Sequence, residues 1–219
     1  MFDYIIISDV HIGSPQFNQY NLFIDMIKNI KTRNIIINGD LFDLWANPKM
    51  DYLTIYRELK KITNADIHYI IGNHDFIVNK YIPTLKYMNI CVDGKNIKIT
   101  HGHKYDSVCK KPWLDKLIVK INIFFLKIFK IDLQYLGRKL FAKNYPEGKF
   151  LPSLYNLRLK AIENIKKEGY DGCVLGHIHY PEKKLLEGNF IYTNSGDWIK
   201  NKSFIGIKDN EIKLYNYEV

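Results

Sequence analysis

Short runs of apolar and β-branched residues recur along the chain and predict β-strands. The runs are continuous rather than alternating, which is typical of strands that are covered on both faces. They lie at 4–8, 34–38, 67–71, 96–100, 172–175, 189–193 and 203–207. Stretches with the apolar spacing of helices lie between them, most clearly at 19–31, 51–63 and 153–168.

The order of these elements predicts an α/β fold. Strands and helices alternate in the first part of the chain, and the last strands follow one another closely. Together these features favour a layered α/β/β/α sandwich. No internal repeat or low-complexity linker divides the 219 residues, so we expect a single domain over 1–219. Residues 112–150 interrupt the alternation and are expected to form a helical insertion.

Five of the predicted strands run directly into a cluster of polar residues. The clusters are Ser8-Asp9-Val10-His11, Gly39-Asp40-Leu41-Phe42-Asp43, Gly72-Asn73-His74-Asp75, His101-Gly102-His103 and Gly176-His177-Ile178-His179. Ligands of open α/β sheets bind in the crevice beyond the carboxyl ends of the strands. We therefore expect the five clusters, which hold six of the seven histidines, to converge on one site.

The residue types in these clusters indicate a metal site. Side chains two apart on an extended segment point to the same face, so Asp9/His11 and His177/His179 can each present two ligands together. Carboxylates, imidazoles and an amide oxygen, without a thiolate, suit Mn, Fe, Zn, Co or Ni rather than Ca, and do not choose among those ions. The candidate ligands are Asp9, His11, Asp40, Asn73, His101, His177 and His179.

Seven ligands exceed the needs of one ion and predict a pair of divalent transition-metal ions, with manganese the ion we expect. Two ions roughly 3.5–4 Å apart are a recurring device for hydrolysing phosphate esters. Taken singly, each cluster could instead be an ordinary turn, because Asn, Asp and Gly favour turn conformations. Five such clusters in one chain, each after a buried strand, favour the metal site.

The series Asp-x-His, Gly-Asp-x-x-Asp, Gly-Asn-His-Asp, His-Gly-His and Gly-His-x-His resembles the calcineurin-like metallophosphoesterases over residues 4–198. The stretches SDVHIG, GDLFDLW, GNHDF and NSGDW are similar to one branch, the UDP-2,3-diacylglucosamine diphosphatase-like proteins. The chain departs from that branch at two positions. His74 stands where its lipid A pathway enzymes often carry Arg, and His103 stands where the branch often has Asp.

The resemblance implies how the ligands divide between the two ions. One ion would be bound by Asp9, His11, Asp40 and His179. The other would be bound by Asp40, Asn73, His101 and His177, so that Asp40 bridges the pair.

The resemblance also implies the catalytic residues. His74 resembles the acid that steadies or protonates the leaving oxygen, and Asp43 would orient its imidazole. A purely structural role for His74 is the alternative. Asp75 and His103 are candidate supports of the site and candidate substrate contacts. Residues 197–198, Asp and Trp, are expected to shape a turn beside the site without taking part in the chemistry.

Residues 113–131 form an amphipathic helical pattern within the insertion. The basic stripe of this pattern consists of Lys116, Lys120, Lys127 and Lys130. Packing on the core is the ordinary interpretation of an amphipathic helix. The alternative is a lid that meets lipid, because a basic amphipathic helix can lie in a membrane interface. The resemblance implies such a lid, with Phe124 and Phe125 as candidate substrate contacts.

The formal net charge of +9 favours anionic partners such as nucleic acid, phosphorylated metabolites or acidic lipid. A composition rich in Lys, Asn and Ile can also reflect genome base bias. Cys91, Cys109 and Cys173 form no close pair, which is typical of a reduced intracellular protein. The N-terminus does not read as a signal peptide, and no apolar stretch reaches the length of a membrane span. We expect a cytoplasmic protein, peripheral on the inner face of the membrane if the lid meets lipid.

Three functions compete. The first is a dimetal phosphohydrolase that cleaves a phosphoanhydride or phosphodiester, with a UDP-2,3-diacylglucosamine-like nucleotide-linked glycolipid as the expected substrate. The second is a nuclease or nucleotide phosphodiesterase, which the charge permits. The chain has no basic run interleaved with aromatic residues, so a nucleic-acid partner is not favoured. The third is a non-catalytic metal-binding scaffold, which the complete ligand set and His74 disfavour. The oligomeric state stays open.

Overall fold

The computed structural model describes residues 1–107, 109–129, 131, 133, 136 and 152–218. The chain divides into two compact units, Met1–Gly102 with Ile165–Val219 and His103–Asn164. The expected insertion at 112–150 falls in the second unit, and its residues 137–150 lie outside the described residues. The two units are described separately below.

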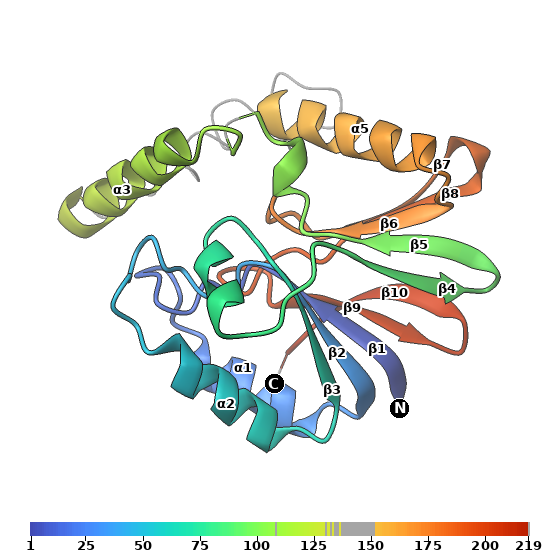
Figure 1. Ribbon diagram of the computed structural model, residues 1–219, viewed down its shortest axis with the longest axis horizontal. Helices are drawn as coiled ribbons and strands as arrows, with labels where there is room; N and C mark the ends of the chain where they lie inside the picture. Colours follow the sequence, from blue (N-terminus) through green and yellow to red (C-terminus); the bar gives the residue numbers. More distant parts are fainter. Residues whose placement is uncertain (108, 130, 132, 134–135, 137–151, 219) are drawn as a thin grey trace. The chain divides into compact units, whose positions relative to one another are not determined.

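The first sheet of the first unit has the strand order β10-β9-β1-β2-β3 (Figure 1). Its strands are β1 (Phe2–Ile7), β2 (Thr32–Asn38), β3 (Asp66–Ile70), β9 (Ser203–Lys208) and β10 (Glu211–Asn216). The strands β1, β2 and β3 are parallel, whereas β9 is antiparallel to both β1 and β10. The carboxyl ends of the three parallel strands therefore lie at one edge of the sheet.

The second sheet has the order β4-β5-β6-β8-β7. Its strands are β4 (Met88–Val92), β5 (Lys95–Ile99), β6 (Gly172–Leu175), β7 (Glu182–Leu186) and β8 (Phe190–Asn194). The strands β5, β6 and β8 are parallel, and the edge strands β4 and β7 pair antiparallel with β5 and β8.

The helices are α1 (Tyr20–Asn29), α2 (Tyr52–Ile62), α3 (Pro112–Phe129) and α5 (Pro152–Lys167), and the 3-10 turns are η1 (Phe76–Lys80), η2 (His103–Tyr105) and η4 (Glu187–Asn189). Apolar residues at helical spacing bury one side of α1, since Phe23, Met26 and Ile27 all face the core. The start of α2 is capped by Asp51, whose side chain accepts a hydrogen bond from the backbone N–H of Thr54 at 3.1 Å.

The burial of β1 explains why its apolar run is continuous. Ile5 and Ile7 belong to a core cluster with Phe23 of α1, whereas Ile6 belongs to a second cluster with Ile97 of β5. Neighbouring residues of a strand point to opposite faces. The first sheet is thus covered by α1 and α2 on one face and by the second sheet on the other (Figure 1).

The last turn of α5 also belongs to the first unit and lies against the second sheet. Ile165 in this turn is fully buried. The Nζ of Lys166 donates to the carbonyl of Glu187 at 3.1 Å and lies 5.2 Å from the centroid of the Phe190 ring. The first unit therefore carries helical residues beside each of its two sheets.

The predicted α/β sandwich is confirmed, and every strand and helix expected from an apolar run is present. The strands β4, β7 and β10 were not predicted. All three are edge strands, and residues such as Cys91, Leu185 and Lys213 are exposed within them. A search for continuous apolar runs misses strands of this kind because only one of their faces is buried. No helix among the described residues is long and apolar enough to cross a membrane.

Candidate metal centre

The polar clusters follow β1, β2, β3, β5 and β6, and the structure brings side chains from all five together within the first unit. Three overlapping groups form there, and the ligand atoms within each group lie within 4.8 Å of one another. The groups are Asp9 with His11 and His179, His11 with Asp40 and His74, and Asp40 with His101 and His177.

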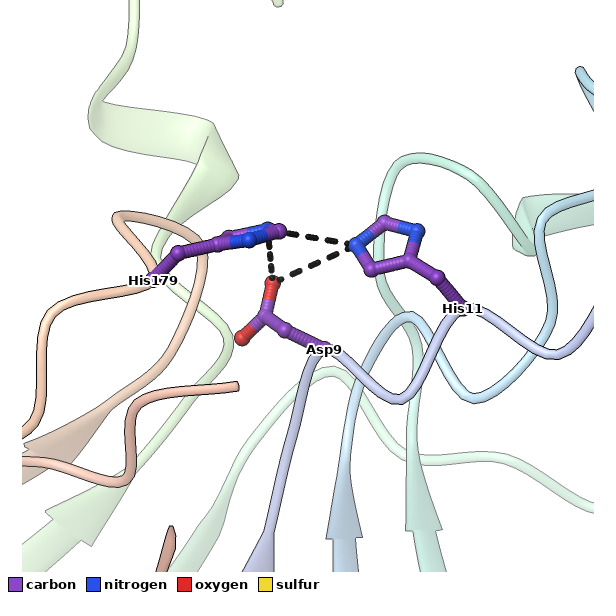
Figure 2. Close-up of side chains that lie close together, drawn as sticks. All are labelled: Asp9, His11 and His179. Carbon is purple, nitrogen blue, oxygen red and sulfur yellow. Dashed lines mark hydrogen bonds and ion pairs between the residues drawn. The ribbon is translucent and has the colours of Figure 1, made fainter. Parts of the chain in front are cut away.

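The first group joins the loops after β1 and β6 (Figure 2). The Nε2 atoms of His11 and His179 lie 3.2 Å apart. The Oδ1 atom of Asp9 lies 3.1 Å from Nε2 of His179 and 3.8 Å from Nε2 of His11. One carboxylate oxygen and two imidazole nitrogens thus face one another, which is an arrangement that a single metal ion can bind.

The other two groups share Asp40, which lies in the loop after β2. Its Oδ2 atom is 3.2 Å from Nε2 of His101 and 3.9 Å from Nε2 of His11. The Nδ1 atom of His101 is hydrogen-bonded to the backbone carbonyl of Asn38 at 2.8 Å, so Nε2 is the nitrogen left for a metal. The His177 ring lies edge-on to the His101 ring, with 5.3 Å between the centroids.

Backbone N–H groups orient both carboxylates. The N–H of His177 donates to Oδ2 of Asp9, and the N–H of His74 donates to Oδ1 of Asp40, each at 2.9 Å. Each carboxylate therefore uses one oxygen to hold its orientation and turns the other oxygen toward the histidine nitrogens. Partners of this kind fix ligands in metal sites.

Five candidate ligands have a left-handed backbone. The φ angle is 54° at Asp9, 56° at His11, 54° at Asp40, 68° at His177 and 53° at His179. This conformation is uncommon for residues other than glycine and, where it occurs, often marks a functional site. The expectation that Asp9/His11 and His177/His179 lie on extended segments is therefore wrong, and tight turns bring these pairs onto the same centre instead.

Glycines in the motifs allow the loops to approach one another closely. A Cβ atom at Gly72 would collide with Oδ1 and the backbone nitrogen of Asp40. A Cβ atom at Gly176 would lie 2.6 Å from Oγ of Ser8 and 2.7 Å from Oδ2 of Asp9. These two positions therefore require glycine for steric reasons.

Electrostatics keep the carboxylates ionised. Burial alone would raise the pKa of Asp9 and of Asp40, but nearby histidines outweigh it and hold both values below their usual range. Burial opposes a proton on His101, yet Asp40 and Asp9 raise its pKa to about 10. Burial keeps the pKa of His179 below its ordinary value despite Asp9. A metal bound by Nε2 of His101 would take the place of its proton.

His74 and Asp43 also lie together. The Nδ1 atom of His74 is 3.0 Å from Oδ1 of Asp43, and that oxygen also accepts from the N–H of Ala46 at 3.0 Å. The other oxygen of Asp43 lies 3.8 Å from Nδ1 of His11. Burial raises the pKa of Asp43, but the hydrogen bond from His74 and the charges of His74 and His11 bring it below the ordinary value. A charged carboxylate is thus directed at the imidazole.

Asn73 and Asp75 lie in the loop after β3. Asp75 is fully buried and accepts hydrogen bonds from the N–H of Gly72 and of Leu41, both at 2.9 Å, and from the hydroxyl of Tyr69 at 2.5 Å. These bonds tie this loop to the loop after β2. Asn73 is buried and precedes His74 in the chain. The backbone N–H of His74 donates to Oδ1 of Asp40.

The expected turn at Asp197 and Trp198 is bonded to both ligand-bearing loops of the first group. The N–H of Trp198 donates to the carbonyl of Asp9 at 3.1 Å. The side-chain amide of Asn201 donates to Oδ2 of Asp197 at 2.5 Å and to the carbonyl of His179 at 3.2 Å. The turn therefore supports the metal centre through backbone contacts.

The remaining predicted site residues lie in the second unit. His103 begins η2, and Phe124 and Phe125 lie on α3 with their rings edge-on and 5.8 Å between the centroids. Phe124 is exposed. The substrate-binding role expected for these residues stays a prediction.

Three residues beside the centre were not identified from the sequence. The indole of Trp45 lies against His74, with 4.4 Å between the ring centroids and 32° between their planes. Tyr69 and Asn201 support the loops as described above. The sequence did contain a signal for Trp45, because this aromatic residue lies two positions after Asp43, at the end of the motif GDLFDLW. The contacts of Tyr69 and Asn201 depend on packing and leave no pattern in the sequence.

The donor set fits divalent transition metals. Buried carboxylates and imidazoles, with no thiolate in the three groups described, suit borderline ions such as Mn, Fe, Zn, Co or Ni. The number of groups and their overlap at His11 and Asp40 fit more than one ion.

Comparison with known proteins identifies similar sequences and folds. The family described as "Calcineurin-like phosphoesterase" matches residues 2–181. A "UDP-2,3-diacylglucosamine hydrolase" of Wigglesworthia glossinidia brevipalpis is 26% identical, covering 93% of this chain and 90% of the relative. Another of that name, from Shewanella loihica, is 24% identical, covering 96% and 94%. The crystal structure of Vps29 from Chaetomium thermophilum has a TM-score of 0.53 at 14% identity, covering 94% of this chain and 81% of that one.

Proposed function

Because this chain belongs to the calcineurin-like phosphoesterase family and is a metal-dependent hydrolase, we propose that it cleaves a phosphoanhydride or phosphodiester in a nucleotide-linked glycolipid. The expected substrate is similar to UDP-2,3-diacylglucosamine. The convergence of three overlapping ligand groups beside the His74–Asp43 pair carries this proposal. Relatives named for hydrolysis of that glycolipid, similar over more than nine tenths of this chain, support the substrate class.

The metal ligands divide between two ions, with manganese the expected metal. Asp9, His11, Asp40 and His179 would hold one ion, and Asp40, Asn73, His101 and His177 would hold the other. The distances of Asp40 Oδ2 from His11 Nε2, 3.9 Å, and from His101 Nε2, 3.2 Å, support its role as the bridge. When bound, such a pair activates water and neutralises phosphate charge.

His74 is the general acid of the proposed reaction. Asp43 holds Nδ1 of the imidazole, which leaves Nε2 to donate its proton to the leaving oxygen. The hydrogen bond with Asp43 at Nδ1 orients the imidazole. His74 thereby supplies the proton that the leaving oxygen takes up, a role that the metal ligands do not have.

We infer that α3 meets the lipid part of the substrate or the membrane that carries it. Apolar side chains are exposed along this helix, among them Phe124 at 54% and Ile128 at 57%. Lys116 and Lys120 are exposed on the same helix. An apolar helix surface bordered by lysines is suited to the interface of an anionic membrane.

A substrate panel with manganese tests this function. The panel contains UDP-2,3-diacylglucosamine, UDP-sugars, cyclic nucleotides, single-stranded DNA and a chromogenic phosphodiester. We expect the highest kcat/KM for the glycolipid and weaker turnover of the chromogenic diester, with both lost in Asp40→Ala. A wide preference for DNA would instead support the nuclease, and no turnover of any compound would support a scaffold.

A further inference from the structure

Trp45 is a buried aromatic residue beside the metal centre. Only 7% of it is exposed. Its near neighbours Phe42 and Leu44 belong to the first apolar cluster. Trp45 combines this burial with a position two residues after Asp43 in the chain.

The indole ring of Trp45 contacts the imidazole of His74. Their centroids lie 4.4 Å apart, and the two ring planes are tilted by 32° to one another. The ring of His11 meets His74 edge-on, at 4.7 Å and 89°. Asp43 holds Nδ1 of His74 at 3.0 Å. Asp43, Trp45 and His11 thus each restrain the imidazole.

These restraints matter because an imidazole has a soft torsion. Rotation about the bond between Cβ and the ring has broad minima, so a hydrogen bond at Nδ1 alone leaves the ring plane free to tilt. The indole of Trp45 limits that tilt. Catalytic groups must keep a productive geometry within narrow limits, and neighbouring side chains supply that restraint.

We propose that Trp45 is a positioning residue that holds the His74 imidazole so that Nε2 stays directed at the leaving oxygen of the substrate. This inference rests on the proposed function, in which His74 is the acid. In the reaction, the oxygen of water joins phosphorus and the bond to the leaving oxygen breaks. The leaving oxygen takes the electron pair of that bond and the Nε2 proton, and the proton released by water restores the imidazolium.

The effect of Trp45 must then depend on the leaving group. A phenolate, like a tyrosine side chain, has a conjugate acid of pKa about 10 and benefits strongly from a proton. A 4-nitrophenolate departs readily without one. A residue needed only for folding would affect both leaving groups equally.

The experiment compares two diesters of thymidine 5′-phosphate that differ only in a phenyl or 4-nitrophenyl leaving group. For Trp45→Leu we expect kcat on the phenyl ester to fall at least about tenfold, with little change on the nitrophenyl ester and unchanged metal content. Trp45→Phe keeps a ring and should retain most of the activity. Tyr81→Leu is the matched control, because Tyr81 is a 68% exposed aromatic residue of the same unit, and both activities should persist.

A second readout does not depend on activity. The carbon-bound ring protons of His74 should carry a ring-current shift from the indole in NMR spectra of the zinc-loaded protein. That shift should disappear in Trp45→Leu and persist in part in Trp45→Phe. Equal kinetic loss on both esters, or unaltered His74 shifts in Trp45→Leu, would overturn the inference. If the wild type hydrolyses neither ester, the proposed function fails, and the NMR shifts still decide whether Trp45 holds the imidazole.

Discussion

The candidate metal centre and helix α3 differ in the burial of the side chains that would contact the substrate. In the centre, Asp9, Asp40 and His101 are buried, and backbone groups fix their orientation. Along α3, residues such as Phe124 and Ile128 are exposed. The centre therefore depends on the position of individual atoms, whereas the proposed lipid contact of α3 would depend on the overall apolar and charged character of the helix. We expect a substitution of a metal ligand to affect every substrate, and one on α3 to affect only substrates that carry lipid.

The largest effect is expected for Asp40→Ala, because Asp40 belongs to two of the three ligand groups. Both ions should be lost and turnover of lipid and soluble substrates should cease. Elemental analysis after manganese reconstitution measures the ions. The control is Asp51→Ala, which removes an exposed helix-capping carboxylate. This variant should keep both metal ions and its turnover of both kinds of substrate. Fewer than one ion per wild-type chain, or full metal in Asp40→Ala, would contradict the proposed centre.

The second-largest effect is expected for substitutions of the proposed general acid, His74, and of its partner Asp43. His74→Ala and Asp43→Asn should lower kcat at least tenfold while the metal content stays, because general acid catalysis typically contributes about 10²–10⁴. Lipid and soluble substrates with similar leaving groups should lose activity alike. The control is His68→Ala, since His68 lies outside the clusters and contacts Asn34 at 3.0 Å. Unchanged turnover in both site variants would place the acid elsewhere.

The pH dependence of stability should distinguish the metal-free from the metal-loaded centre. Against the effect of burial, Asp40 and Asp9 raise the pKa of His101 from 6.5 to about 10. A raised pKa stabilises the folded state fully below the unfolded value and loses that contribution as pH rises through the folded value. The metal-free protein should therefore lose unfolding free energy between about pH 6.5 and 10.

Thermal unfolding in chelator and in manganese, across that pH range, measures this effect. The metal-loaded protein should show a flatter profile, because the ion replaces the proton of His101. His101→Gln should flatten the profile of the metal-free protein as well. A steep loss of stability that persists in His101→Gln would assign the pH dependence to other groups.

The smallest effect is expected on α3. Lys116→Glu combined with Lys120→Glu should weaken binding to anionic vesicles, since each lysine near such a surface contributes about 1 kcal/mol. Activity on a lipid-bearing substrate should fall while turnover of a soluble diester persists. Lys60→Glu with Lys61→Glu on α2 changes the net charge equally and is the control. Equal loss on both substrates, or unaltered vesicle binding, would remove α3 from lipid recognition.

The elements of the fold could be predicted where burial leaves a pattern. The central strands β1, β2 and β6 are buried on both faces, so their apolar runs are continuous and visible in the sequence. The edge strands β7 and β10 have partly exposed faces and resemble loops in composition. The candidate ligands could be identified from the sequence because each lies in a short motif directly after one of these recognisable strands.

The sequence by itself determined the strand–cluster pattern, the types of candidate ligand and the family resemblance, because these depend on residues close together in the chain. Only the tertiary structure decided which atoms meet. His11 and His179 are 168 positions apart, and their 3.2 Å approach requires the packing of two sheets. The same holds for the contact between the rings of Trp45 and His74. Local spacing sets backbone preference and periodicity, but the distance between remote side chains depends on how the buried faces of the sheets pack together.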